Sequence, residues 1–277
     1  MRAETTHQQR PRFQPWQRNL IVILVFLIAD QLVFPLYQFL GIEMNWDSLT
    51  ERLLLNHSWQ LFPPLAIAAL FFGFRRAPWA LGLQASLWTG LAFGMFCTLP
   101  MLIGYALFGS FSPGERPLWS QTAYSLFPGV FEEIFFRGFL FGLLFRFGGW
   151  GFLPASLLGA VFFGAGHMWQ GADLAETVGV VAITATGAVW FAYLYAEWDD
   201  NLWVPITFHV LMNAWWGLFA ISDTALGGAV GNIFRFATIA LSIAVTVGMV
   251  RRRGAGSRLR GHWLVRRLTP EPLKSPA

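Results

Sequence analysis

The chain has 277 residues, of which 55% are hydrophobic and only 12% are charged, and its mean hydropathy is +0.50. A soluble domain carries roughly 25% charged residues, so this composition excludes an ordinary soluble protein and indicates one that lies in a membrane. The net charge of +4 and the pI of about 9.7 come mainly from arginines beside apolar runs, so they indicate membrane topology and not nucleic-acid binding.

Eight apolar runs are long enough, or nearly long enough, to cross a bilayer as helices. They cover residues 19–40, 59–74, 81–108, 124–147, 151–168, 177–196, 204–222 and 229–250. We therefore expect an all-α, polytopic integral membrane bundle of about eight transmembrane helices. In this interpretation a transmembrane domain at 19–250 lies between an N-terminal arm at 1–18 and a basic C-terminal tail at 251–277.

Arginines flank this domain in three places: before the first run, after the second and after the last. They are Arg2, Arg10, Arg12 and Arg18, then Arg75 and Arg76, then Arg251, Arg252, Arg253, Arg258, Arg260, Arg266 and Arg267. The positive-inside rule predicts that all three segments are cytoplasmic, and an even number of crossings between them agrees. We expect a multi-pass plasma-membrane protein with both termini in the cytoplasm. The glycines and prolines of the tail predict that it is largely disordered.

Two smaller features complete this outline. Cys97 is the only cysteine, which excludes a disulfide or a thiolate metal site within one chain. Asp30 and Gln31 interrupt the first run, and we interpret them as a hydrogen-bonding pair between helices.

The fourth run contains three charged residues, Glu132, Glu133 and Arg137. An ionised side chain at the bilayer centre costs about 2.5–3.5 kcal/mol, and such residues usually have a function. Glu133 and Arg137, four apart, share a helix face and can form an ion pair. Glu132 lies about 100° round the helix, which leaves it to act as a general base toward water. The alternative is a buried ion pair that only fixes helix packing.

Two later runs carry further polar groups. His167 closes the fifth run, and His209 and Asn213 share a helix face early in the seventh. The other histidines lie outside the runs: His7, His57 and His262. Singly, His167 fits an interfacial residue, and His209 with Asn213 fits an interhelical hydrogen bond. Together with Glu132 they are the groups that activate water and stabilise a tetrahedral intermediate, or that bind a metal.

The three motifs Glu132-Glu133-x-x-x-Arg137, Phe163-x-x-x-His167 and His209-x-x-x-Asn213 resemble, in this order, those of the CPBP intramembrane proteases. This is the family of the type II CAAX prenyl protease and the bacterial Abi-type proteins. The segment Asn201-Leu202-Trp203-x-Pro205-Ile206 is similar to the family as well, and the resemblance covers roughly residues 120–216.

The resemblance implies an intramembrane endopeptidase. In that family pattern Glu132 and His167 position and deprotonate a water molecule, and His209 and Asn213 form the oxyanion hole. Glu133 and Arg137 would support them. The implied partners are a peptide or protein substrate, with or without a lipid modification, and membrane lipids; no nucleic acid is expected.

The resemblance leaves metal dependence open. Zinc sites use His, Cys or acidic side chains and not an asparagine amide, so we favour a metal-free, glutamate-dependent site without a cofactor. The alternative is a divalent metal such as zinc bound by Glu132, His167 and His209.

Two other function classes compete with the protease. Intramembrane Glu, Arg and His also mark proton- or ion-coupled transporters, although the sequence shows no inverted repeat and no paired broken helices. A non-catalytic immunity or scaffold protein would keep the fold, but intact motif residues argue against a degenerate site.

The order of the runs raises a difficulty. Glu132 begins one run and His167 ends the next, which places both at one side of the membrane, whereas His209 near the start of the seventh run falls at the other. Either the groups meet near the middle of the membrane, or a segment within 169–204 does not cross fully. We expect a polar cavity that reaches the middle.

Overall fold

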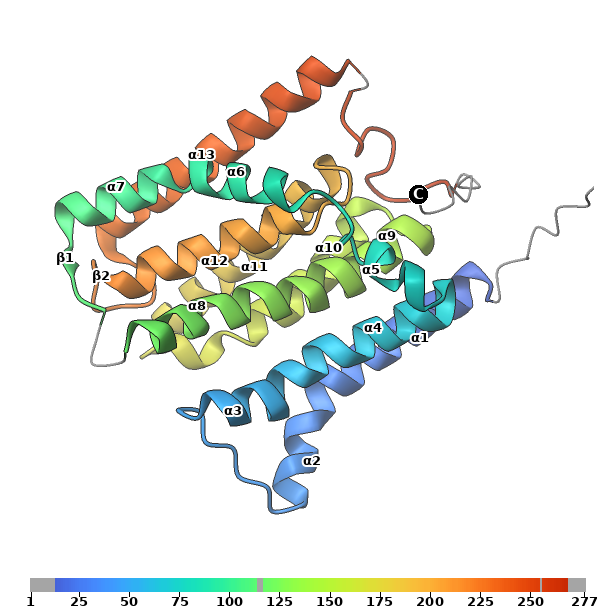
Figure 1. Cartoon of the computed structure of the whole chain (residues 1–277), viewed down its shortest axis with the longest axis horizontal. Helices are drawn as coiled ribbons and strands as arrows, with labels where there is room; N and C mark the ends of the chain where they lie inside the picture. Colours follow the sequence, from blue (N-terminus) through green and yellow to red (C-terminus); the bar gives the residue numbers. More distant parts are fainter. Residues whose placement is uncertain (1–12, 114–116, 255, 269–277) are drawn as a thin grey trace, which may run out of the picture.

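The computed structural model describes residues 13–113, 117–254 and 256–268. Over these residues the protein is an assembly of packed helices (Figure 1), and one two-stranded sheet accompanies them. The expected all-α membrane bundle is therefore confirmed. The N-terminal arginines Arg2, Arg10 and Arg12, and His7, lie outside the described residues.

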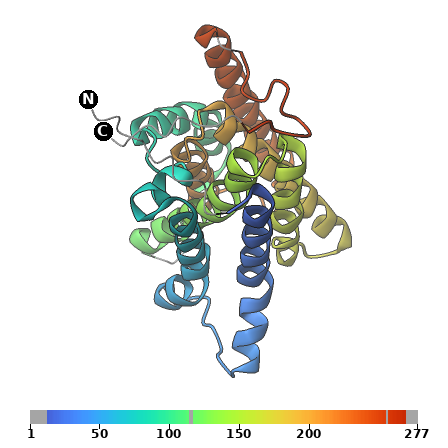
Figure 2. The same cartoon turned by 90° about the vertical axis from the view of Figure 1, so that its right-hand side faces the viewer.

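The first part of the chain forms two long helical stretches and a short connection. The first stretch comprises α1 (Pro15–Leu27), η1 (Ile28–Leu32) and α2 (Val33–Phe39). The second comprises α3 (Leu49–Glu51), η2 (Arg52–His57) and α4 (Ser58–Phe72), and η3 (Phe74–Arg76) and α5 (Ala77–Ala80) follow. α4 lies beside α1 in both views (Figures 1 and 2).

The segment between the first two predicted runs, residues 41–58, is partly helical. A helix already begins at Leu49, because the Ser48 side chain caps it by accepting a hydrogen bond from the Glu51 amide at 3.3 Å. Two π-helical stretches, η1 and η2, interrupt the α-helical geometry of this region.

The remaining elements form the larger part of the bundle. They are α6 (Leu87–Cys97), α7 (Leu99–Phe108), β1 (Ser110–Phe111), α8 (Leu118–Glu132), η4 (Glu133–Phe141), α9 (Gly142–Phe147), α10 (Phe152–Ala165), η5 (Met168–Gln170), α11 (Leu174–Glu197), α12 (Trp203–Leu218), β2 (Phe219–Ala220) and α13 (Gly228–Arg253). The strands β1 and β2 pair antiparallel, with Ser110 opposite Ala220.

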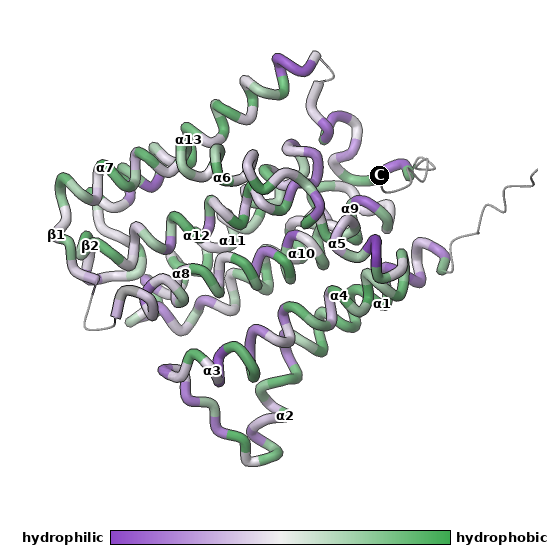
Figure 3. The backbone as a smooth tube through the Cα atoms, in the orientation of Figure 1, coloured by the Kyte–Doolittle hydropathy of each residue, from purple (hydrophilic) through white to green (hydrophobic). Residues whose placement is uncertain are grey.

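Within the described ranges, five helical stretches are long and apolar enough to cross a membrane. They are Pro15–Phe39, Leu87–Phe108, Phe152–Gln170, Leu174–Glu197 and Gly228–Arg253, and Figure 3 shows their apolar character. Helices also lie at the other predicted ranges. However, α4 and α12 have only 15 and 16 residues, and charged side chains lower the hydropathy of the α8–α9 stretch. The integral membrane class holds, but the count of eight spans is not confirmed.

α12 lies inside the bundle, between α6 and α8, and also packs against α11 (Figure 1). Two glycines allow its neighbours to come close. A Cβ atom at Gly94 of α6 would lie 2.6 Å from Thr207 of α12, and one at Gly129 of α8 would lie 2.5 Å from Val210. The close approach of α8 and α12 brings the first and third sequence motifs together.

The described arginine-rich segments lie toward one end of the bundle. The start of α1, the short helix η3 and the end of α13 all lie toward the right-hand side of Figure 1. This arrangement agrees with the clustering that the positive-inside pattern predicts. Which compartment this end faces stays a prediction.

The described part of the C-terminal tail is not disordered, so that expectation is wrong for residues 256–268. Val265 pairs with Trp150, and Leu259 is 1% exposed. Arg258 forms an ion pair at 2.9 Å with Asp200, which also pairs with Arg146 at 3.2 Å. A buried carboxylate needs compensating charge, and the tail supplies part of it for Asp200.

Candidate active site

Glu133 and His209 connect the first and third motifs in the interior of the bundle. Nη1 of Arg137 lies 3.0 Å from Oε1 of Glu133, and Nδ1 of His209 lies 2.8 Å from the same oxygen. The side chains of Glu133 and Arg137 are 0% and 2% exposed. The ion pair that the four-residue spacing predicts is therefore present, and the contact with His209 is an addition that the sequence did not reveal.

The first and third motifs meet within the bundle, although the order of the runs placed them at opposite sides of the membrane. Glu133 lies near the middle of the stretch from Leu118 to Phe147, and His209 lies within α12. α11 has 24 residues, and at about 1.5 Å per residue it is long enough to cross the hydrocarbon core. The first and third motifs therefore meet part-way along their helices, and the full crossing of the segment within 169–204 stays a prediction.

Glu133 and Arg137 lie on η4, a π-helical stretch of nine residues that are all buried. π-helical turns inside α-helices are frequent at functional sites. The Arg137 guanidinium lies 4.5 Å from the ring centroid of Phe163 and 5.1 Å from that of Phe191. These aromatic faces and the Glu133 carboxylate together compensate a cation that would otherwise be very costly to bury.

His167 follows the end of α10 and is partly buried. Its Nδ1 lies 2.6 Å from the backbone oxygen of Phe163. A carbonyl oxygen only accepts, so Nδ1–H is the donor and Nε2 of the neutral ring presents a lone pair. That is the state which a group needs in order to accept a hydrogen bond or a proton from water.

The ring of Phe163 lies between the two motif histidines. Its centroid is 4.6 Å from that of His167 and 6.4 Å from that of His209. Phe163 is therefore a common neighbour of both imidazoles and of the Arg137 guanidinium. Phe163 belongs to the second motif, but its role could not be predicted from the sequence, because a phenylalanine in a membrane helix carries no chemical signal of its own.

The contact with Glu133 also sets the chemistry of His209. Because Nδ1 donates to the carboxylate, Nε2 carries a hydrogen only when the ring is doubly protonated. An imidazolium in this position can donate from Nε2 while Glu133 neutralises its charge. Glu133 therefore fixes the orientation of the His209 ring.

Glu132 and Asn213 are partly buried. Among the described residues the Glu132 carboxylate forms no hydrogen bond or ion pair, although its charge acts on Arg137 and on His57. The Asn213 side-chain amide, one turn beyond His209 on α12, likewise has no hydrogen-bond partner among the residues that the structure describes. The structure does not bring His167 or Asn213 into contact with Glu132, so the assigned roles of all four residues stay predictions.

The metal alternative requires Glu132, His167 and His209 to converge. Over residues 13–113, 117–254 and 256–268, no three His, Cys, Asp or Glu side chains form a group that could hold a metal ion. The three residues named for zinc are therefore not gathered into a ligand set in this arrangement.

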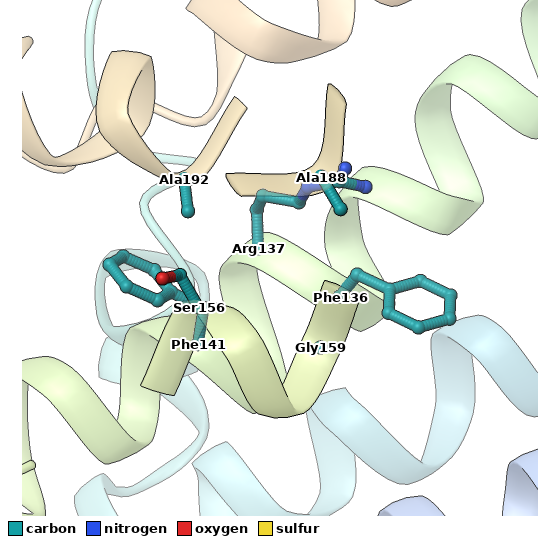
Figure 4. Close-up of a pocket in the computed structure, with 7 residues that line it drawn as sticks. All are labelled: Phe136, Arg137, Phe141, Ser156, Gly159, Ala188 and Ala192. Carbon is teal, nitrogen blue, oxygen red and sulfur yellow. The ribbon is translucent and has the colours of Figure 1, made fainter. Parts of the chain in front are cut away.

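A small void lies beside Arg137, between η4, α10 and α11 (Figure 4). It is lined by Phe136, Arg137, Phe141, Ser156, Gly159, Ala188 and Ala192. Its volume of about 10 Å³ is close to the room that one water molecule needs. Figure 4 shows the guanidinium of Arg137 beside Ala188. Glu132, His167 and His209 do not line this void, so it is not the polar cavity that we expected.

His57 is a further residue that the sequence analysis set aside, because it precedes the second apolar run. In the structure it is 1% exposed and its ring stacks on Phe131, the residue before Glu132, at 4.9 Å. No spacing in the sequence indicates this contact, since it joins η2 to α8 across a long stretch of chain.

Comparison with known proteins adds one finding. A family model described as type II CAAX prenyl endopeptidase Rce1-like matches residues 114–215, a range that contains all three motifs. No curated protein and no solved structure matches the chain. Residues 114–215 are thus similar to the Rce1-like type II CAAX prenyl endopeptidases, in a chain whose long apolar helices fit an integral membrane protein.

Proposed function

We propose that this endopeptidase cleaves membrane-associated CAAX-type substrates with a metal-free site in which Glu132 activates water. The observation that carries the proposal is the shared contact of Glu133 Oε1 with Arg137 and His209. It engages Oε1 of Glu133 with a cation and an imidazole, whereas Glu132 has no ion-pair or hydrogen-bond partner among the described residues and is the acid of the motif that we assign to the chemistry.

In this mechanism a water molecule is held between the Glu132 carboxylate and Nε2 of His167. Glu132 removes a proton while the water oxygen attacks the carbonyl carbon of the scissile peptide bond. General-base catalysis of this kind contributes about 100- to 10,000-fold to the rate. The hydrogen bond from His167 to Phe163 supports the assignment, because it leaves the Nε2 lone pair toward the water.

The negative charge that develops on the carbonyl oxygen needs donors in a water-poor site. We assign this task to Nε2–H of His209 and the side-chain amide of Asn213. Glu133 holds the His209 ring in place through Nδ1, and Arg137 pairs with Glu133. Glu132 then passes its proton to the departing nitrogen, so that the C–N bond breaks and an acid and an amine remain.

The substrate assignment rests on the family and not on a shaped pocket. We propose a peptide that ends in a Cys-aliphatic-aliphatic-X sequence and that carries a lipid on its cysteine, because such a chain partitions into the membrane where the site lies. From the positive-inside rule, we also propose that the protein lies in the plasma membrane with its arginine-rich end on the cytoplasmic side.

The test is cleavage by the purified full-length protein in vesicles, followed by mass spectrometry of the products. Peptides that end in Cys-aliphatic-aliphatic-X are compared with and without a prenyl group on the cysteine, and a peptide with serine at that position is the control. Cleavage of the prenylated peptide alone is expected. Failure to cleave any of the peptides, under conditions in which the protein is folded, would contradict the proposal.

A further inference from the structure

His57 lies in a buried position that the proposed mechanism does not yet use. It closes the π-helical stretch η2 and is 1% exposed. Its ring stacks on Phe131 at 4.9 Å with an interplanar angle of 17°, and it meets the edge of Phe127 at 5.7 Å. Both phenylalanines belong to α8, so the ring is fixed against the helix that carries Glu132.

The two ring nitrogens of His57 differ in their surroundings. Nδ1 lies 2.9 Å from Oε1 of Gln60, one turn further along the same helix. Nε2 is buried and has no hydrogen-bond partner among the described residues. A buried polar atom without a partner is costly and is often explained by a functional role.

The contact with Gln60 determines what Nε2 can do. An amide oxygen accepts, so Nδ1 of His57 carries the hydrogen and Nε2 of the neutral ring carries a lone pair. Burial lowers the pKa of His57, which favours the neutral ring at physiological pH. Two charged groups act electrostatically on the ring, Arg52 from η2 and Glu132 from α8. Glu132 also acts electrostatically on Arg137.

The Nε2 lone pair of His57 cannot form a hydrogen bond with an ionised carboxylate, because both groups are acceptors and no hydrogen lies between them. Glu132 acquires that hydrogen when it takes the proton of the attacking water. We propose that His57 is a positioning residue for Glu132 and that its Nε2 accepts a hydrogen bond from the protonated Glu132 carboxyl group, directly or through one water. This inference rests on the proposed role of Glu132 as the general base.

The consequence is a defined place for the proton during the reaction. It leaves the water as the C–O bond forms, and the Glu132 oxygen carries it while Nε2 of His57 accepts the hydrogen bond. It then moves to the nitrogen of the departing amine as the C–N bond breaks. His57 stabilises the intermediate state by holding the Glu132 side chain, and the histidine itself does not touch the substrate.

The variant His57→Phe removes Nε2 but keeps a flat ring that stacks on Phe131. We expect its kcat to fall about 10- to 100-fold, as for other losses of a supporting hydrogen bond, while KM stays within twofold. His57→Gln places an amide oxygen near the position of Nε2 and should recover most of the rate. The control His262→Phe removes a histidine of the C-terminal tail whose Nδ1 is also buried without a partner, and it should leave kcat unchanged.

The pH profile separates this role from simple packing. If His57 stabilises the protonated form of Glu132, its loss makes that proton easier to remove, so the acid limb of kcat/KM in His57→Phe moves to lower pH. A structural defect would lower the rate without moving the limb. An unshifted limb, a kcat within twofold of wild type, or a His57→Gln protein as slow as His57→Phe would each overturn the inference.

Glu132→Gln is measured beside these variants. If it cleaves at the wild-type rate, the proposed function itself fails. If Glu132→Gln is inactive and His57→Phe behaves as wild type, only the role of His57 fails. Should His57→Phe not fold, Gln60→Leu provides the second variant: it frees Nδ1, allows the hydrogen to move to Nε2, and should shift the acid limb in the same direction.

Discussion

Oε1 of Glu133 and Nδ1 of His209 are 2.8 Å apart, which joins α12 to the helix that carries the paired glutamates across 76 positions of sequence. Both side chains lie inside the bundle, and the glutamate is fully buried. The two adjacent acids therefore differ in environment, since one is engaged by a cation and an imidazole and the other is not. The first prediction tests that difference.

Glu132→Gln should lower peptide cleavage by about 100- to 10,000-fold, because the amide keeps the shape of the side chain but cannot accept a proton. The thermal unfolding temperature in detergent should stay close to that of the wild type, since the carboxylate has no partner in the described protein. Activity and unfolding are measured on the same preparation. A Glu132→Gln protein that cleaves at the wild-type rate would contradict the role of Glu132 as the general base.

Arg137→Leu should destabilise the protein by about 3–5 kcal/mol, because it leaves the Glu133 carboxylate buried beside His209 without its cation. The double variant Glu133→Leu/Arg137→Leu should be more stable than Arg137→Leu alone, although inactive. Unfolding in detergent of both single variants and the double variant gives the coupling energy directly. Additive losses would show that the 3.0 Å contact contributes no coupling.

His209→Ala should lower kcat by about 100- to 1,000-fold, because it removes one donor of the proposed oxyanion hole. The measurement is kcat for peptide cleavage by the wild type and the variant, with unfolding in detergent followed on the same preparations. His262→Ala in the C-terminal tail is the control and should keep the wild-type rate. A His209→Ala protein with unchanged kcat would contradict the assigned role.

Chelation distinguishes the metal-free site from the zinc alternative. We expect the purified active enzyme to contain no stoichiometric zinc and to keep its rate after dialysis against a strong chelator. If Glu132, His167 and His209 bind zinc, substitution of any one of them should reduce the metal content. A loss of activity on chelation that added zinc restores would refute the metal-free proposal.

Leu259→Ala should destabilise the protein by about 2–5 kcal/mol, because it leaves a cavity under the packed C-terminal tail. Leu259 is 1% exposed, whereas Leu268 in the same tail is 40% exposed, so Leu268→Ala is the matched control and should be nearly neutral. Thermal unfolding of the two variants is the measurement. Equal behaviour would show that the tail does not contribute through burial.

The helices were predictable from the sequence because apolar runs in a membrane have few alternatives to a helix. The Glu133–Arg137 pair followed from the four-residue spacing, which is a local property. The number of membrane-spanning helices could not be predicted in the same way. α12 is short, and the stretch through Glu132 is charged, so length and hydropathy alone do not identify these helices as spans.

The contacts that sequence analysis missed are all non-local. His57 and Phe131 are far apart in the chain, and the pairing of Glu133 with His209 depends on how closely α8 approaches α12 at Gly129. The packed tail was missed for a related reason. Its glycines and prolines are typical of disorder, and only the structure shows the buried Asp200 that Arg258 neutralises.

The ion pair between Asp200 and Arg258 has a consequence for biogenesis. Arg258 is synthesised 58 residues after Asp200, and the whole of α13 lies between them. The contact forms only if α12 and α13 have both entered the bilayer in the correct orientation, because one reversed or missed crossing would leave Arg258 on the opposite side. Completion of this ion pair therefore requires correct insertion, and a misinserted chain keeps an incompletely neutralised acid at Asp200.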